Sequence, residues 1–167
     1  MGKKLIIING VMGVGKTTIC RELYKSLTNA FWLDGDWCWM MNPFKSSTEN
    51  RKMVIDNITY MLNNFLESSC SKYVIFNWVI DTDGIMNIVV DNLKTSNYEI
   101  YKITLLCDKD ELVERIQKDI NKGLRKEEDI KKSLQRYKIY EMVRSIKIDT
   151  TNKSVNQVVN EIKSIIS

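Results

Sequence analysis

The sequence predicts an α/β fold, a three-layer α/β/α sandwich in which helices cover both faces of a five-stranded parallel sheet. Short continuous apolar runs recur along the chain, as is typical of strands buried on both faces of such a sheet. Segments with apolar residues at helical spacing separate these runs, and this alternation is characteristic of α/β proteins. The first run leads directly into a glycine-rich turn, so a ligand site is expected at the carboxyl ends of the strands.

In the N-terminal half, three apolar runs predict strands, and two apolar stripes predict the helices between them. The first strand ends in glycine, and the second closes on the acidic turn Asp34-Gly35-Asp36. An irregular segment, residues 37–47, follows that turn. The predicted elements are, in order, a strand at 5–9, a helix at 16–28 (Ile19, Leu23, Leu27), a strand at 30–33, a helix at 54–65 (Val54, Ile58, Leu62, Phe65) and a strand at 73–80.

The C-terminal half continues the alternation with one break. Residues 122–129 contain Gly123 and a dense cluster of charges, so this segment can bury little. The final helix is amphipathic. The predicted elements are, in order, a helix at 85–93, a strand at 100–107, a helix at 112–120 (Leu112, Val113, Ile116, Ile120), a helix at 130–140 (Ile130, Leu134, Tyr137, Tyr140), a strand at 145–148 and a helix at 155–166 (Val155, Val158, Val159, Ile162, Ile166).

Length and composition indicate an ordered globular chain. The 167 residues are 44% hydrophobic and 28% charged, and they fit one domain over residues 1–167. The net charge of +4 is dispersed among acidic neighbours, which suits anionic ligands without requiring nucleic acid. The N-terminal apolar run is too short for a signal peptide or a membrane span, so we expect a cytoplasmic protein without a membrane partner.

Cysteine and histidine content excludes several kinds of chemistry. The four cysteines, Cys20, Cys38, Cys70 and Cys107, form no C-x-x-C pair, and the chain contains no histidine to complete a mixed zinc site. We expect four reduced thiols in or near the core. The absence of histidine also excludes mechanisms that need imidazole as a base or metal ligand.

The strongest functional signal is a complete Walker A sequence, G-x-x-x-x-G-K-[ST], between a predicted strand and a predicted helix. Its glycines let backbone N–H groups point at phosphate oxygens, and the following helix adds its positive N-terminus. Lys16 is expected to reach the β- and γ-phosphates of ATP, and the Thr17 hydroxyl to bind Mg²⁺. The predicted nucleotide-binding residues of this loop are Gly10, Met12, Gly13, Val14, Gly15, Lys16, Thr17 and Thr18.

The remaining sequence narrows the class of nucleotide-binding protein. GTPases need an N-K-x-D segment that reads guanine, and none is present, because residues 121–124 read Asn-Lys-Gly-Leu. Large ATPases need far more chain than this. A domain of the nucleoside monophosphate kinase type remains.

At this point the chain resembles the P-loop small-molecule kinases, a group that includes shikimate, gluconate and adenylylsulfate kinases, the nucleotide kinases and chloramphenicol phosphotransferase. Residues 33–36, Leu-Asp-Gly-Asp, are similar to the L-D-G-D of adenylylsulfate kinases, and residues 112–115, Leu-Val-Glu-Arg, match the helix after strand four. Residues 148–151 are similar to the place where these kinases lay a loop along adenine. The resemblance implies the sheet order 2-3-1-4-5, a mobile lid near residues 122–129 and an adenine contact at Thr151.

The resemblance also suggests roles for charged residues. As in the D-x-D of shikimate kinase, Mg²⁺ is expected at Thr17 and one aspartate of the pair; we assign Asp34 to Mg²⁺ and Asp36 to the acceptor hydroxyl as general base, although the two roles could be exchanged. A polar turn with a helix-capping aspartate is the alternative. Arg115 and Arg125 are expected to neutralise charge on the transferred phosphoryl group, or else to be solvated helix charges.

The sequence departs from the family after the D-G-D turn. An aromatic segment replaces the asparagine and arginine of adenylylsulfate kinases, which argues against adenylylsulfate as acceptor, and strand three ends without a conventional Walker B aspartate. Arg51 is a candidate for holding an acidic acceptor, although a solvated surface charge is favoured. Four aromatic residues are expected either to line an acceptor pocket or to lie in the core, namely Trp37, Trp39, Phe44 and Trp78.

Together these observations predict an ATP-dependent phosphotransferase that moves the γ-phosphoryl group to a hydroxyl of a small molecule such as a metabolite, nucleotide or antibiotic. Two alternatives stay open: a nucleoside monophosphate kinase, whose acceptor is a phosphate and needs no base, and a nucleotide-binding protein that confers drug resistance by sequestration without turnover. A monomer or homodimer is expected.

Overall fold

The computed structural model describes residues 2–94 and 97–167, and its centre is one five-stranded sheet. All four strand pairings are parallel, in the order β2-β3-β1-β4-β5. This confirms both the predicted fold class and the predicted strand order. The strands are β1 (Lys3–Gly10), β2 (Ala30–Asp34), β3 (Tyr73–Asn77), β4 (Tyr98–Leu106) and β5 (Ile146–Asp149).

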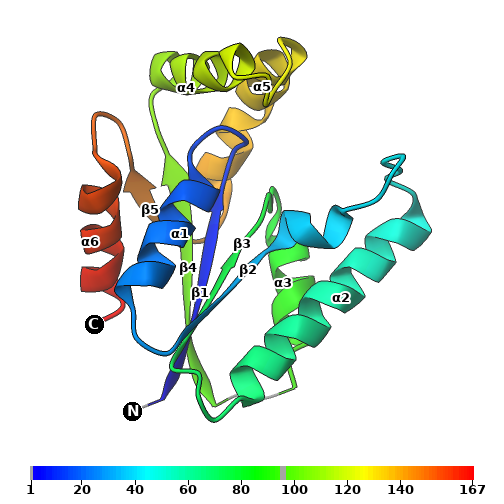
Figure 1. Ribbon diagram of the computed structural model, residues 1–167, viewed down its shortest axis with the longest axis vertical. Helices are drawn as coiled ribbons and strands as arrows, with labels where there is room; N and C mark the ends of the chain where they lie inside the picture. The colour runs from blue at the N-terminus through cyan, green and yellow to red at the C-terminus, as the bar shows by residue number, and fades with distance from the viewer. Residues whose placement is uncertain (1, 95–96) are drawn as a thin grey trace.

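Helices cover both faces of the sheet (Figure 1). In that view α1 and α6 lie on one side of the strands and α2 and α3 on the other, while α4 and α5 extend past their carboxyl ends. Across residues 2–94 and 97–167, no helix combines the length and apolar character needed to cross a membrane. The helices are α1 (Lys16–Ser26), α2 (Thr48–Glu67), α3 (Asp83–Asp91), α4 (Lys109–Asn121), α5 (Glu128–Met142) and α6 (Val155–Ile165), and η1 (Gly35–Trp39) is a 3₁₀ helix.

The central strand β1 explains why its sequence is apolar at consecutive positions. Leu5 and Ile7 belong to the hydrophobic cluster under α2 and α3, whereas Ile6 and Ile8 belong to the cluster on the opposite face. Successive side chains of a strand point to opposite faces, so a strand covered on both sides needs apolar residues at every position. Because β1 is buried on both faces, the turn that follows it has a fixed position at the carboxyl ends of the strands.

Helix α2 begins at Thr48, six residues before the predicted start at Val54. The Ser47 side chain caps its N-terminus by accepting a hydrogen bond from the backbone N–H of Asn50 (3.1 Å). The first turn is solvated and carries no apolar stripe, so apolar periodicity alone missed it. The capping serine was the available signal.

Strand β3 ends at Asn77, although the apolar run predicted a strand as far as residue 80. The backbone N–H of Trp78 still bonds the carbonyl oxygen of Ile8 in β1 (3.3 Å), but that of Ile80 bonds the side-chain oxygen of Asn9 (2.9 Å), so the regular pairing ends before residue 80. Trp78 and Val79 line a cavity, and Ile80 is buried in the core. The first part of the apolar run is a buried strand, and the second part is apolar because it lines a cavity and enters the core.

The cysteines are all free thiols, and two of them, Cys20 and Cys107, are buried. Cys38 is half-buried beside the turn after β2. Cys70 is exposed in the connection between α2 and β3, so the expectation that all four lie in or near the core was wrong for Cys70. A short polar connection offers no apolar surface to cover it.

Two methionines offer a matched test of the core on the α2 and α3 side. Met86 is 1% exposed within that cluster, whereas Met142 is 82% exposed at the end of α5. Met86→Ala should lower the free energy of unfolding by about 2–5 kcal/mol, because it removes buried apolar contacts and leaves a cavity. Met142→Ala should change it by less than about 0.5 kcal/mol. Urea denaturation measures both, and equal effects would contradict this description of the core.

Candidate active site

The turn between β1 and α1 has the backbone conformation that the Walker A glycines predict. Gly13 and Gly15 have φ angles of +90° and +104°, a region that favours glycine. A Cβ atom added at Gly13 would lie 2.5 Å from Cγ1 of Ile116 in α4. Gly13 is therefore required twice, once by its conformation and once by the close packing of the loop against α4.

Lys16 begins α1 and lies inside this loop. Its ammonium donates hydrogen bonds to the carbonyl oxygens of Gly10 (2.9 Å) and Val11 (3.1 Å), and the residue is 8% exposed. Burial lowers the pKa of Lys16 to about 8, although the carboxylates of Asp36 and Asp34 act in the opposite direction. The loop thus surrounds a buried cation that a bound polyphosphate would complement.

Asp34 joins the phosphate loop to the turn after β2. Its Oδ2 accepts a hydrogen bond from the Thr17 hydroxyl (2.8 Å), and its Oδ1 accepts one from the backbone N–H of Asp36 (3.0 Å). Asp34 is 3% exposed at the end of β2 and caps η1. The Asp34 carboxylate therefore caps η1, as the alternative expected. It also lies beside Thr17, as metal binding would require.

The oxygen atoms of Thr17 and Asp34 fit the requirements of Mg²⁺. They are hard ligands on adjacent elements, and Mg²⁺ in kinases takes one or two protein oxygens together with phosphates and water. Among the described residues, no group of three or more His, Cys, Asp or Glu side chains could hold a metal by itself. The site therefore suits a metal that arrives with a phosphate ligand.

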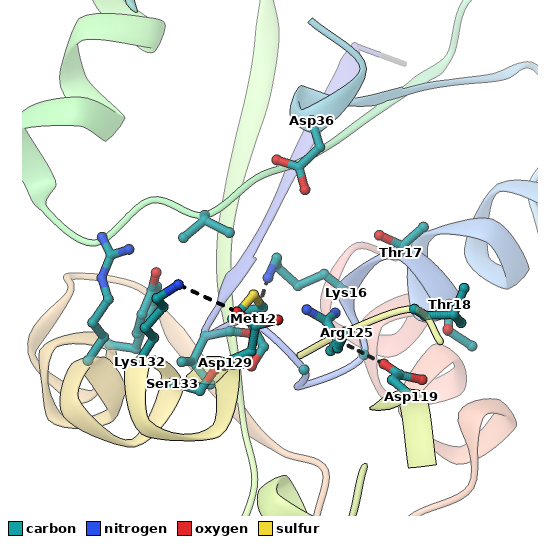
Figure 2. A pocket seen from close by; sticks show the side chains of 17 residues that line it. Met12, Lys16, Thr17, Thr18, Asp36, Asp119, Arg125, Asp129, Lys132 and Ser133 are labelled. Carbon is teal, nitrogen blue, oxygen red and sulfur yellow. Dashed lines mark hydrogen bonds and ion pairs between the residues drawn. The ribbon is translucent and has the colours of Figure 1, made fainter. Parts of the chain in front are cut away.

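A cavity of about 640 Å³, here called the phosphate-loop cavity, opens above the loop. Figure 2 shows Lys16, Asp36 and Arg125 directed into it from three different segments. Arg125 also pairs with Asp119 of α4 through its Nε (3.0 Å). Desolvation in the cavity and the neighbouring Asp34 raise the pKa of Asp36, against the effect of Lys16 and Arg125. Three of the four predicted catalytic residues thus lie in one cavity.

The fourth, Arg115, lies elsewhere. Its guanidinium donates to the carbonyl oxygen of Val14 (2.8 Å) and to the hydroxyl (3.0 Å) and carbonyl (3.0 Å) of Thr150, and it pairs with Glu111. It borders a neighbouring pocket of about 440 Å³, here called the side pocket, rather than the phosphate-loop cavity. Arg115 connects the loop to the β5–α6 connection, and its part in catalysis stays a prediction.

Most of the predicted nucleotide-binding residues border one or both of these cavities, but Gly10 and Thr151 border neither. Thr151 bonds Asp149 (2.6 Å) and the backbone N–H of Asp108 (2.8 Å), and it is Thr150 that borders the side pocket. Gly10 contributes its carbonyl oxygen to Lys16. The residues at the phosphate-loop cavity are Met12, Gly13, Gly15, Lys16, Thr17 and Thr18, and those at the side pocket are Gly13, Val14, Gly15 and Thr18.

The segment expected as a lid, residues 122–129, includes the start of a helix. Helix α5 begins at Glu128, so Glu128 and Asp129 belong to its first turn, where acidic side chains are stabilised by the helix dipole. Residues 122–127 connect α4 to α5. Leu124 in this connection is 71% exposed. Whether it closes over a ligand stays a prediction.

A second cavity, here called the aromatic cavity, adjoins the first. It measures about 980 Å³, and its aromatic walls are Trp39, Phe44 and Trp78. Trp37 borders a different pocket and packs on Trp32, with ring centroids 5.0 Å apart. Three of the four aromatic residues therefore line the aromatic cavity, and two of them, Trp39 and Trp78, also pack against the core cluster under α2 and α3. Asp36, Val79 and Arg136 border both cavities.

Sequence analysis missed Arg136 and Asp81. Arg136 lies on α5 and forms an ion pair with Asp81, which follows β3. No motif marks either residue. Both lie at the boundary of the aromatic cavity because α5 folds back toward the carboxyl end of β3, a contact between segments that are distant in the sequence.

Comparisons with known proteins show the family to which this chain belongs. The AAA domain family matches residues 6–135. A shikimate kinase of Bacillus cereus (strain G9842) is 30% identical over 173 residues, covering 98% of this chain and 99% of the relative. A shikimate kinase of Bacillus mycoides (strain KBAB4) is 29% identical with the same coverage.

Solved structures show the same fold at lower identity. The Deinococcus radiodurans tunicamycin resistance protein has a TM-score of 0.71 and 18% identity, covering 99% of this chain and 96% of that one. A gluconokinase from Sinorhizobium meliloti 1021 has a TM-score of 0.66 and 15% identity, covering 96% and 88%. The chain belongs to the AAA domain family and to the P-loop small-molecule kinases.

The position of Lys16 predicts the effect of removing its charge. Lys16→Met keeps the length of the side chain but removes the cation from the loop, so the affinity for Mg-ATP should fall at least about a hundredfold while the protein stays folded. Isothermal titration calorimetry measures the affinity, and circular dichroism the fold.

Lys25 on the same helix supplies the control for this substitution. It is exposed and pairs with Glu22 (2.9 Å), so Lys25→Met should leave nucleotide affinity within about twofold. Wild-type affinity in Lys16→Met would contradict the placement of nucleotide phosphates in this loop.

Proposed function

We propose that this P-loop kinase transfers the γ-phosphoryl group of ATP to a hydroxyl group of a small molecule. One observation carries the proposal: the Asp36 carboxylate borders both the phosphate-loop cavity and the aromatic cavity. A base in that position can reach a hydroxyl held in one cavity and a phosphate held in the other. Kinase relatives that cover the whole chain support the same reaction class.

In this mechanism Asp36 accepts the hydroxyl proton as the acceptor oxygen attacks the γ-phosphorus and the bond to the β,γ-bridging oxygen breaks, which releases ADP. Lys16 holds the β- and γ-phosphates, and Arg125 stabilises charge on the transferred group. Mg²⁺, held near Thr17 and Asp34, would neutralise phosphate charge. The adenine would occupy the side pocket beside Arg115 and Thr150.

The acceptor is a metabolite, nucleotide or antibiotic that bears a hydroxyl. Shikimate, named in the sequence relatives, and gluconate, named in a structural neighbour, are the first compounds to test. A mononucleotide panel tests the phosphate-acceptor alternative. Tunicamycin, named in another neighbour, tests the sequestering alternative, for which binding without turnover is diagnostic.

The decisive experiment incubates the protein with Mg-ATP and a metabolite mixture and follows the mass increase of one phosphoryl group together with ADP formation. A product phosphorylated on a hydroxyl supports the proposal. A phosphorylated phosphate supports a nucleoside monophosphate kinase, and tight binding of a compound without product supports sequestration.

Substitution of Asp36 and of Asp34 should have different effects on catalysis and nucleotide binding. Asp36→Asn should keep nucleotide affinity but lower the rate constant for transfer by about two to four orders of magnitude, because it removes the base; a dissociative transition state favours the lower end. Asp34→Asn should weaken Mg-ATP binding and be partly rescued by high Mg²⁺. Single-turnover kinetics over a Mg²⁺ series separates the two. Turnover within a few-fold of wild type in Asp36→Asn would contradict general-base catalysis.

Residues 122–127 should become better protected from amide exchange when ligands bind. They contribute little buried apolar surface, so their amides should exchange rapidly in the free protein and slow by at least about tenfold with an ATP analogue and acceptor. Hydrogen exchange followed by mass spectrometry measures this, with peptides of β1 as an internal control. Equal amide protection of residues 122–127 with and without ligands would contradict a lid that closes on binding.

A further inference from the structure

Arg125 lies close to α4 because the chain turns back at the end of that helix. Gly123 has a φ angle of +72°, a left-handed conformation that commonly ends a helix. Its backbone N–H bonds the carbonyl oxygen of Ile120 (2.8 Å), and that of Leu124 bonds the carbonyl oxygen of Asp119 (2.9 Å). The turn therefore brings the next residue, Arg125, back beside the last turn of α4.

The Asp119 side chain holds Arg125 by one edge of its guanidinium. Arg125 Nε donates to Asp119 Oδ2 (3.0 Å), both side chains are half-buried, and both residues border the phosphate-loop cavity (Figure 2). The contact uses Nε, and the remaining N–H donors of a guanidinium belong to its two terminal nitrogens. Asp119 thus leaves the end of the arginine that suits a phosphate group available to a ligand.

Arg125 needs such a partner because it shares the cavity with Lys16. Burial is the largest cause that lowers the pKa of Lys16 to about 8, and the Arg125 cation adds to this effect. Two cations directed into one partly desolvated cavity repel each other when no phosphate lies between them. Repulsion and side-chain entropy would both favour an Arg125 that turns out to solvent, and the Asp119 carboxylate opposes this.

The position of Asp119 in α4 gives an independent reason to assign it to the site. It lies in the last turn of the helix, where the helix dipole disfavours a negative charge and favours a cation such as the neighbouring Lys118. The carboxylate is therefore unfavourable for the helix itself. Its contact with Arg125 is the interaction that explains an aspartate here.

We propose that Asp119 is a positioning residue, whose carboxylate holds Arg125 in the phosphate-loop cavity before a nucleotide binds, with the terminal guanidinium nitrogens available to the γ-phosphate. This rests on the proposed function for the role of Arg125. It goes beyond that function because it assigns Asp119 to the machinery and places the arginine in the cavity of the free protein.

Removal of the carboxylate gives a result whose sign decides between positioning and charge. Loss of a negative charge near the phosphates would by itself strengthen the binding of every nucleotide. Loss of positioning should weaken only ligands that carry a γ-phosphate. Asp119→Ala should therefore lower the affinity for the non-hydrolysable analogue Mg-AMP-PNP about fivefold relative to Mg-ADP, because Arg125 must then be ordered on binding. Isothermal titration calorimetry measures both ligands.

A double variant tests whether Asp119 acts through Arg125. Arg125→Met should lower the ratio of the two affinities at least as much as Asp119→Ala does. In the Arg125→Met background, Asp119→Ala should then change that ratio by less than about twofold, since residues that act as one unit are not additive. Asp110→Ala removes the same side chain from the exposed start of α4, outside the lining of the cavity, and should leave the ratio unchanged.

Stability provides the second measurement. The backbone carbonyl oxygen of Asp119 still accepts from Leu124 in Asp119→Ala, so the end of α4 is retained, and the midpoint of urea denaturation should stay close to that of the wild type. A purely structural role would instead lower this midpoint and weaken both nucleotides together.

The outcomes separate this inference from the proposed function. A γ-phosphate preference that depends on Asp119 and Arg125, without any phosphorylated product in the metabolite experiment, would support the positioning and contradict the kinase function. A phosphorylated product together with an unchanged affinity ratio in Asp119→Ala would support the kinase function and overturn the positioning. Tighter binding of both nucleotides, equal weakening of both, or an effect of Asp119→Ala that persists without Arg125 would also overturn it.

Discussion

The buried carboxylate of Asp34 holds the two halves of the candidate site together. One of its oxygens accepts a hydrogen bond from Thr17 at the start of α1, and the other accepts one from the backbone of Asp36 in η1. β2 is an edge strand, paired with β3 up to the register of Asp34 with Asn77. Because one side chain bonds both the phosphate loop and the turn that carries Asp36, a displacement of either would be transmitted to the other.

The opposite side of the loop is held by α4 and α5. Gly13 packs against Ile116, and the Ser133 hydroxyl donates to the carbonyl oxygen of Met12 (3.1 Å). The Tyr137 hydroxyl bonds the carbonyl oxygen of Cys107 (2.8 Å), which anchors α5 to the end of β4. The exposed connection 122–127 therefore lies between two anchored helices. Such an arrangement allows local movement near the phosphates without disturbing the sheet.

The aromatic residues near η1 serve two different purposes. Trp32 donates to the side chain of Asn77 (2.6 Å), at the end of β3 where a Walker B aspartate is absent, and Trp37 packs on Trp32. Trp78 lies against Gly35, where an added Cβ atom would approach its ring to 2.5 Å. The first set stabilises the sheet edge, and Trp78 forms a cavity wall. The negative charge that a metal would meet here comes from Asp34 rather than from β3.

Local patterns in the sequence sufficed to predict the strands, most of the helices, the phosphate loop and the Asp34–Asp36 pair, because conformation and chemistry there depend on neighbouring residues. The structure decided the rest. No local pattern distinguishes Trp39 and Trp78, which line the aromatic cavity, from Trp37, which packs on Trp32. Likewise, Arg115 borders the side pocket because its guanidinium bonds Thr150. Arg136 and Asp81 are 55 positions apart, and their pairing follows from how α5 returns to the sheet, which no local pattern encodes.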